Sequence, residues 1–129
     1  MDVIADTSVV IALEREARRG VGPAHAFLKE HAEDRFYITF TVSGELACGE
    51  SAAAESAWQE LIAPYALLGW RPNVSLQYGR IYRSLKTRGE LIGTNDLWIA
   101  ATALSYAMPI ATRNASEFAR VDGLQVLSS

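Results

Sequence analysis

The chain has 129 residues, of which 50% are hydrophobic, and a formal net charge of −3 at pH 7. This length and apolar content predict one compact domain, residues 1–129, with a single core. The mildly acidic net charge argues against a protein that binds nucleic acid through its overall charge, so a polyanion would have to bind at a local basic patch. We expect a cytoplasmic protein without a membrane partner, because no run approaches the roughly 20 apolar residues of a membrane span and the N-terminus lacks the pattern of a secretory signal.

Short apolar segments alternate with longer segments of helical period along the chain. The strand-like segments are Val3–Ala5, Phe36–Thr39, Ala66–Trp70, Ile110–Thr112 and Leu124–Leu127. The helical segments are Ser8–Arg18, Pro23–Ala32, Ser43–Gly49, Ala52–Ile62, Asn73–Thr87 and Asp96–Met108. Because the strands are apolar without a polar alternation, each should be covered on both faces. This order predicts an α/β fold in which helices cover a central parallel sheet.

The segment Asp96–Met108 is the clearest helix, since it is nearly continuously apolar and should therefore be buried. Pro109 should end it before the next strand. At its start, three side chains are able to cap the helix. They belong to Thr94, Asn95 and Asp96.

The segment Asn73–Thr87 should turn its apolar side chains inward and leave its basic side chains to solvent. The inward set is Leu76, Ile81 and Leu85. The basic set is Arg80, Arg83, Lys86 and Arg88, with no acid among them. Such a cluster is either a solvated helix end near its negative dipole terminus or a local site for a polyanion. Arg113 and Arg120 form a second basic candidate.

Four acidic residues lie at the edges of apolar segments: Asp6, Glu45, Asp96 and Glu117. Asp6 directly follows the first strand, so it should emerge at the carboxyl edge of the sheet, where ligands bind in open α/β folds. The loop after the strand Ile110–Thr112 returns to the same edge. Taken singly, each acid has an ordinary explanation, because Asp6 and Asp96 could cap helices while Glu45 and Glu117 could face solvent.

If the four side chains converge, they cannot all stay charged without a cation, because like charges at close range raise one another's pKa. Ligation by oxygen alone, without a His or Cys cluster, favours Mg²⁺ or Mn²⁺ over zinc. Such a site activates water and stabilises charge at phosphorus, so phosphodiester hydrolysis is the natural reaction.

The remaining chemically active side chains have structural interpretations. Cys48 is the single cysteine, so it cannot form an internal disulfide, and on a helix it should behave as a small core residue. His25 and His31 flank a surface-like helix and fit no metal-ligand spacing.

Four stretches resemble the motifs of a PIN domain, and more narrowly of the VapC ribonuclease toxins of bacterial toxin–antitoxin pairs. They are Ile4–Ser8, Thr41–Gly49, Gly89–Leu104 and Ala111–Val121, in the family's order and with family-like gaps. One departure concerns Asn114, since many PIN domains have an aspartate there, and the fourth acid is then left to Glu117. Asn114 could still contact a metal through its carbonyl or through water.

The resemblance implies a three-layer α/β/α domain with a parallel sheet of four to five strands. It implies a homodimer that cleaves RNA with Mg²⁺ or Mn²⁺ and is inhibited by a VapB-like antitoxin whose tail lies over the acidic pocket. Asp6, Glu45, Asp96 and Glu117 would then form the metal and catalytic site, with Thr7, Thr112 and Asn114 supporting it. Arg80, Arg83, Lys86, Arg88 and Arg113 would contact RNA.

Three other assignments compete with this one. A PIN fold kept as a non-catalytic RNA-binding or interaction module would share the fold without cutting. A receiver-like phosphoacceptor domain fits poorly, because Asp6 lies too early in the chain and the other receiver residues are missing. A DNA-directed nuclease of the same superfamily is disfavoured by the small size without insertions. Which RNA is cut does not follow from the sequence, since that choice depends on loop and groove shape.

Overall fold

The strands form one parallel sheet in the computed structural model, which describes residues 1–128. Their bounds are β1 (Asp2–Ala5), β2 (Arg35–Thr39), β3 (Ala66–Leu68), β4 (Ile110–Thr112) and β5 (Val126–Ser128). The order across the five-stranded sheet is β3-β2-β1-β4-β5, so β1 is the central strand. Every pairing is parallel, from β2 with β3 to β4 with β5. The predicted parallel sheet is confirmed.

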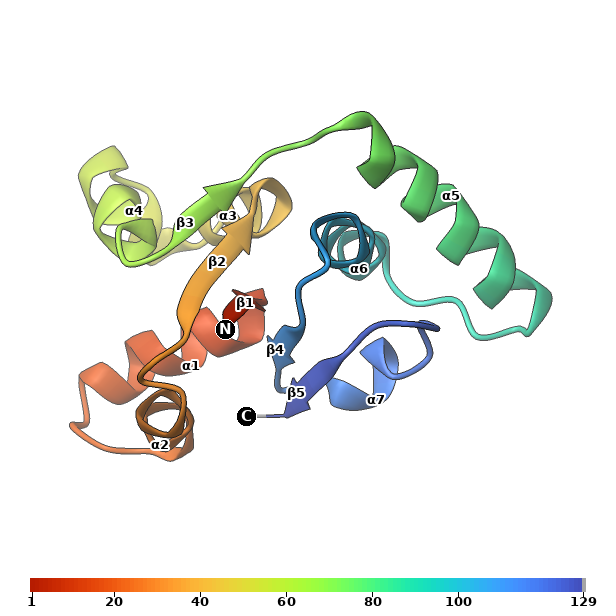
Figure 1. Cartoon of the computed structure of the whole chain (residues 1–129). Helices are drawn as coiled ribbons and strands as arrows, with labels where there is room; N and C mark the ends of the chain where they lie inside the picture. The colour runs from red at the N-terminus through yellow and green to blue at the C-terminus, as the bar shows by residue number, and fades with distance from the viewer. Residues whose placement is uncertain (129) are drawn as a thin grey trace.

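Helices connect the strands and cover both faces of the sheet. Their bounds are α1 (Thr7–Ala17), α2 (Pro23–Glu30), α3 (Phe40–Ala47), α4 (Glu55–Ile62), α5 (Pro72–Thr87), α6 (Thr94–Tyr106) and α7 (Ala115–Phe118), with a 3₁₀ turn at Glu50–Ala52. Figure 1 shows α5 and α6 together on one side of the sheet and α1 and α2 together on the other. This is the three-layer α/β/α arrangement. Within residues 1–128, no helix has the length and apolar character needed to cross a bilayer.

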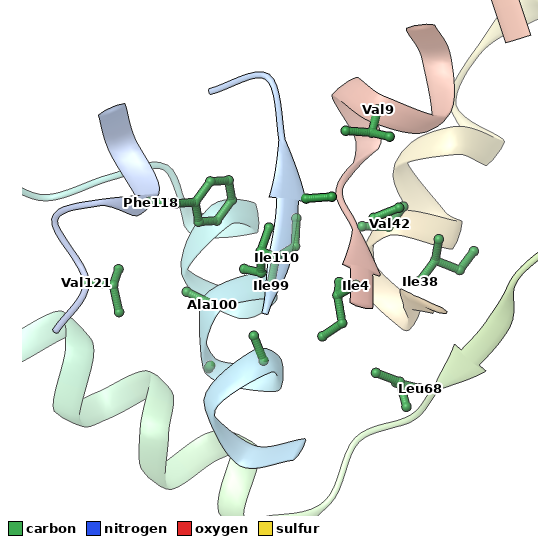
Figure 2. Packing of buried hydrophobic residues seen from close by; sticks show 14 of the residues in the cluster. Ile4, Val9, Ile38, Val42, Leu68, Ile99, Ala100, Ile110, Phe118 and Val121 are labelled. Carbon is green, nitrogen blue, oxygen red and sulfur yellow. The ribbon is translucent and has the colours of Figure 1, made fainter. Parts of the chain in front are cut away.

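The core lies between the sheet and its helices. Side chains of the central strands, such as Ile4 and Ile110, meet Ile99 of α6 and Phe118 of α7, and all four are fully buried (Figure 2). Most apolar residues of α6 are buried as the sequence predicts, whereas Trp98 and Leu104 are half-buried. Burial of such side chains stabilises the fold by roughly 1.5–3 kcal/mol each. The core therefore holds rigid the edge of the sheet from which the acidic residues project.

Several local predictions were wrong at element ends. Helix α3 begins at Phe40 rather than Ser43, because the Thr39 hydroxyl accepts a hydrogen bond from the Val42 amide and caps the helix three residues earlier. Helix α6 is not capped by a side chain, since Gly93 holds the N-cap position. It ends before Ala107, whose φ of 55° is left-handed.

Other errors concern which side chains are buried. Leu76 is 66% exposed, whereas the inward face of α5 uses Val74 together with Ile81 and Leu85. Cys48 is exposed because it lies just past the end of α3 rather than within its buried face. The predicted helix Ala52–Ile62 is divided, since the 3₁₀ turn ends at Ala52 and α4 begins only at Glu55.

Candidate functional site

The four acidic residues reach the same edge of the sheet by different routes. Asp6 follows the central strand β1 directly, and its amide donates to the Ala111 carbonyl at the end of β4. Glu45 lies on α3, which begins where β2 ends. Helix α6 leads into the amino end of β4, so its first turn, with Asp96, lies at the carboxyl edge. Glu117 lies on α7, just after β4.

Asp6 is the most enclosed of the four, with 3% of its surface exposed. It caps α1, because Oδ1 accepts a hydrogen bond from the Val9 amide at 3.1 Å. The same oxygen accepts from the Ser8 hydroxyl at 2.5 Å, and Oδ2 accepts from the Thr112 hydroxyl at 2.5 Å. The capping role and the site role therefore coexist in one residue. Three donors make this buried carboxylate tolerable.

The predicted supporting residues hold this edge together. The Thr7 hydroxyl donates to Glu45 Oε1 at 2.9 Å and so connects α1 to α3. The Thr112 hydroxyl, besides donating to Asp6, accepts from the Asn114 amide at 2.9 Å. The side chain of Asn114 is exposed, so the backbone N–H of this residue, and not its side-chain carboxamide, takes part in the network. Each threonine proton is thus directed at a carboxylate.

Asp96 and Glu117 form the second half of the site. Burial, followed by a hydrogen bond with Glu117 and the surrounding negative charge, raises the pKa of Asp96 from 3.8 to about 7. The charges that act on it belong to Glu117, Asp6 and Glu45. Each of the other three acids is therefore within electrostatic reach of Asp96. Below about pH 7, the Asp96 carboxyl therefore holds its proton.

The donor chemistry of this edge fits a hard divalent cation. In the part of the chain that the structure describes, no three His, Cys, Asp or Glu side chains are gathered closely enough to hold an ion as they stand. The Asp6 and Glu45 oxygens are held instead by hydroxyl groups. All four predicted ligands are nevertheless carboxylates, and burial together with the neighbouring negative charge raises the pKa of Asp96, which is the situation a divalent cation relieves.

The predicted RNA-binding residues are divided by their contacts. Arg80 and Arg83 are exposed on α5, and Arg113 is exposed beside the site. Lys86 lies over the ring of Tyr82, 5.6 Å from its centroid. Arg88 is held in ion pairs with Glu90 and Asp122, each at 3.1 Å. The cations are thus not equally free to bind phosphate.

Ser8 is a site residue that sequence reasoning left out of the predicted set. Its hydroxyl donates to Asp6 and accepts from the Arg113 amide at 3.1 Å. The available signal was its position two residues after a helix-capping aspartate, where a short hydroxyl side chain can turn back to the cap.

A groove leads away from the site along α1. A hollow of about 250 Å³ is lined by Glu45 and by Ile11, Arg15 and Leu46. Glu14 and Leu61 also line the adjoining hollow of about 470 Å³ between α1 and α4. That hollow in turn shares Leu13 and Tyr65 with one of about 720 Å³ at the amino edge of the sheet.

Comparison with known proteins gives one family. The PIN domain model matches residues 3–124. Ribonuclease VapC1 of Haemophilus influenzae (strain R2866) is 33% identical over 132 residues, which cover 97% of this chain and 96% of that protein. Ribonuclease VapC of Rickettsia bellii is 32% identical, with 99% and 96% covered. Among solved structures, VapBC-1 from nontypeable Haemophilus influenzae matches with a TM-score of 0.77 at 28% identity, over 99% of this chain and 98% of that one.

Proposed function

The chain belongs to the PIN-domain family, and on this premise we propose that it is a VapC-type ribonuclease, the toxin of a toxin–antitoxin pair. The observation that carries the proposal is the position of Asp6, Glu45, Asp96 and Glu117 at the carboxyl edge of the sheet, where burial, a hydrogen bond with Glu117 and the neighbouring carboxylates raise the pKa of Asp96. Relatives similar over almost the whole chain are named ribonucleases. A non-catalytic module would have no need for so costly a concentration of negative charge.

The reaction is hydrolysis of an RNA phosphodiester bond with Mg²⁺ or Mn²⁺ held by Asp6, Glu45, Asp96 and Glu117. When bound, the ion supplies an activated water and stabilises charge at phosphorus. Thr7 and Thr112 fix the orientation of the Glu45 and Asp6 carboxylates through their hydroxyl protons. The Asp96 carboxyl, whose pKa is raised to about 7, has to lose its proton before it can act as a charged ligand.

RNA binding is assigned to exposed cations of the chain. Arg113 follows β4 directly beside the site, and Arg80 and Arg83 lie on the solvent side of α5. Guanidinium groups position a phosphate backbone without reading its sequence, which suits a chain whose overall charge is mildly negative. Lys86 and Arg88 have weaker support, because each already has a partner within the protein.

The partner is a VapB-like antitoxin, since structures similar to this chain are those of VapBC complexes. The groove from the amino edge of the sheet to Glu45 is where we place its tail. The apolar side chains of Leu13, Leu61 and Tyr65 would receive apolar residues of that tail. The acidic end at Glu45 would receive a basic one. A homodimer and a cytoplasmic location are further parts of this proposal.

Cleavage of total RNA by the purified chain in Mn²⁺ tests the function. Asp96→Asn should abolish the appearance of new RNA ends, because it removes a charged ligand while its amide keeps a hydrogen-bond donor toward Glu117. Asp122→Asn is the matched control, since Asp122 is an exposed acid that pairs with Arg88 on the surface. Equal cleavage by wild type and Asp96→Asn would contradict the catalytic site. RNA binding without cleavage by the wild type would favour the non-catalytic module.

A further inference from the structure

Two hydroxyl groups hold the two oxygens of Asp6 in the same manner. The Ser8 hydroxyl donates to Oδ1 and accepts from the Arg113 amide. The Thr112 hydroxyl donates to Oδ2 and accepts from the Asn114 amide. Asp6 is thereby connected, through one hydroxyl on each side, to two consecutive backbone amides of the loop between β4 and α7.

The direction of each hydrogen bond in these chains is fixed. A backbone amide can only donate, so the hydroxyl oxygens of Ser8 and Thr112 must accept from Arg113 and Asn114. Each hydroxyl has one proton, and that proton is then directed to an Asp6 oxygen. Ser8 connects two separate elements, because it belongs to α1 whereas Arg113 belongs to the loop 105 positions away. Thr112 is already part of the strand that leads into the loop.

We propose that Ser8 is a positioning residue, which holds the Asp6 carboxylate and the Arg113 loop in register so that Asp6 and Glu117 face the same ligand. Only the effect of Ser8 on RNA cleavage rests on the proposed function; its effects on amide exchange and on Mn²⁺ binding do not. The loop is short: Arg113 and Asn114 are followed at once by α7, which contains Glu117. A displaced Arg113 therefore displaces the fourth acid, and it also moves the cation closest in sequence to the site.

A purely structural role would have different consequences. The N-terminus of α1 is capped by Asp6 through the Val9 amide, and this bond does not involve Ser8. Loss of the Ser8 hydroxyl should thus leave the helix formed. Thr102 offers a contrast, because its buried hydroxyl donates to the Trp98 carbonyl of its own helix and connects no second element. Thr102→Val is accordingly the control for the loss of a hydrogen-bonded hydroxyl.

The test compares wild type, Ser8→Ala, Ser8→Thr and Thr102→Val in three measurements. Amide hydrogen exchange reports whether Arg113 is released, with the Ile99 amide of the buried helix α6 as the internal reference. Mn²⁺ binding, followed by electron paramagnetic resonance, reports whether the ligand set is weakened. Cleavage of RNA reports kcat and KM separately.

We expect Ser8→Ala to accelerate exchange of the Arg113 amide at least tenfold and to weaken Mn²⁺ binding by about 10- to 100-fold, the usual effect of losing a hydrogen bond that orients a metal ligand. It should lower kcat with little change in KM. Ser8→Thr should restore all three quantities, and Thr102→Val should change none of them.

The inference is overturned if Ser8→Ala keeps wild-type Arg113 exchange and Mn²⁺ affinity, or if Ser8→Thr fails to restore them. Failure of the proposed function gives a different result. In that case the wild type cleaves no RNA, and exchange and Mn²⁺ binding still decide the role of Ser8 by themselves.

Discussion

The raised pKa of Asp96 predicts that removing this carboxylate stabilises the protein above neutral pH. The folded state holds the proton with a pKa of about 7, against the ordinary value of 3.8. The stabilisation that comes with the protonated form is complete below about 3.8 and is lost as the pH rises through about 7. At pH 8 the ionised Asp96 carboxylate therefore lowers the free energy of unfolding of the wild type by its full amount, whereas Asp96→Asn has no such charge.

The size of the effect follows from that interval. At about 1.36 kcal/mol for each pH unit, complete conversion would give about 4 kcal/mol. The carboxyl is only half-buried, so solvent screening reduces the expected gain to roughly 1–2 kcal/mol at pH 8. At pH 5 the gain should be less than half as large, because the wild type keeps its proton in the folded state.

Denaturant unfolding in EDTA, at pH 5 and pH 8, measures both quantities for the wild type and Asp96→Asn. Asp122→Asn serves as the control and should show no gain at either pH, because Asp122 is exposed and paired with Arg88. A loss of stability in Asp96→Asn at pH 8, or a gain of equal size at both pH values, would show that burial and the neighbouring carboxylates do not raise the pKa of Asp96 in the folded state.

Three further perturbations test other parts of the structure. Gly22→Ala should cost about 1–3 kcal/mol in thermal unfolding, because a Cβ there would lie 2.2 Å from Oε1 of the buried Glu16; unchanged stability would mean that Glu16 moves freely. Ala107→Gly should raise the free energy of unfolding by about 0.5–1 kcal/mol, since glycine accepts the left-handed φ of 55° without strain, and a decrease would contradict this. Arg80→Ala or Arg83→Ala should each reduce the slope of log K against log salt for single-stranded RNA by about 0.7; identical slopes would exclude phosphate contacts there.

The sheet and its buried helix were predictable because their signals are local and agree with one another. The apolar runs at Ile110–Thr112 and in α6 have no other stable environment than a covered core. Element ends were harder. The cap at Thr39 competes with two other hydroxyl residues nearby in sequence, Thr41 and Ser43, and only the chain direction after β2 decides which one acts. The four-residue helix α7 is too short to show a period.

The candidate site was predictable as a set of residues but not as a set of contacts. The position of Asp6 after an apolar strand and of Asp96 beside an apolar helix indicated both residues. The partnership of Asp96 with Glu117 could not be derived, because it depends on how α7 packs after β4. The same holds for Ser8, whose acceptor role requires the Arg113 amide from the far end of the sequence. The predicted burial of Leu76 was wrong because helical spacing identifies an apolar face but does not show how far around the helix the contact with the core extends.

The contact between Asp6 and Thr112 joins residues separated by 106 positions. During synthesis, Asp6 therefore leaves the ribosome well before β4, the strand that completes its surroundings. A growing polypeptide has no finished pocket until β4 has been made. For an enzyme whose substrate is RNA, this topology delays the onset of cutting until β4 has been translated and folded against β1.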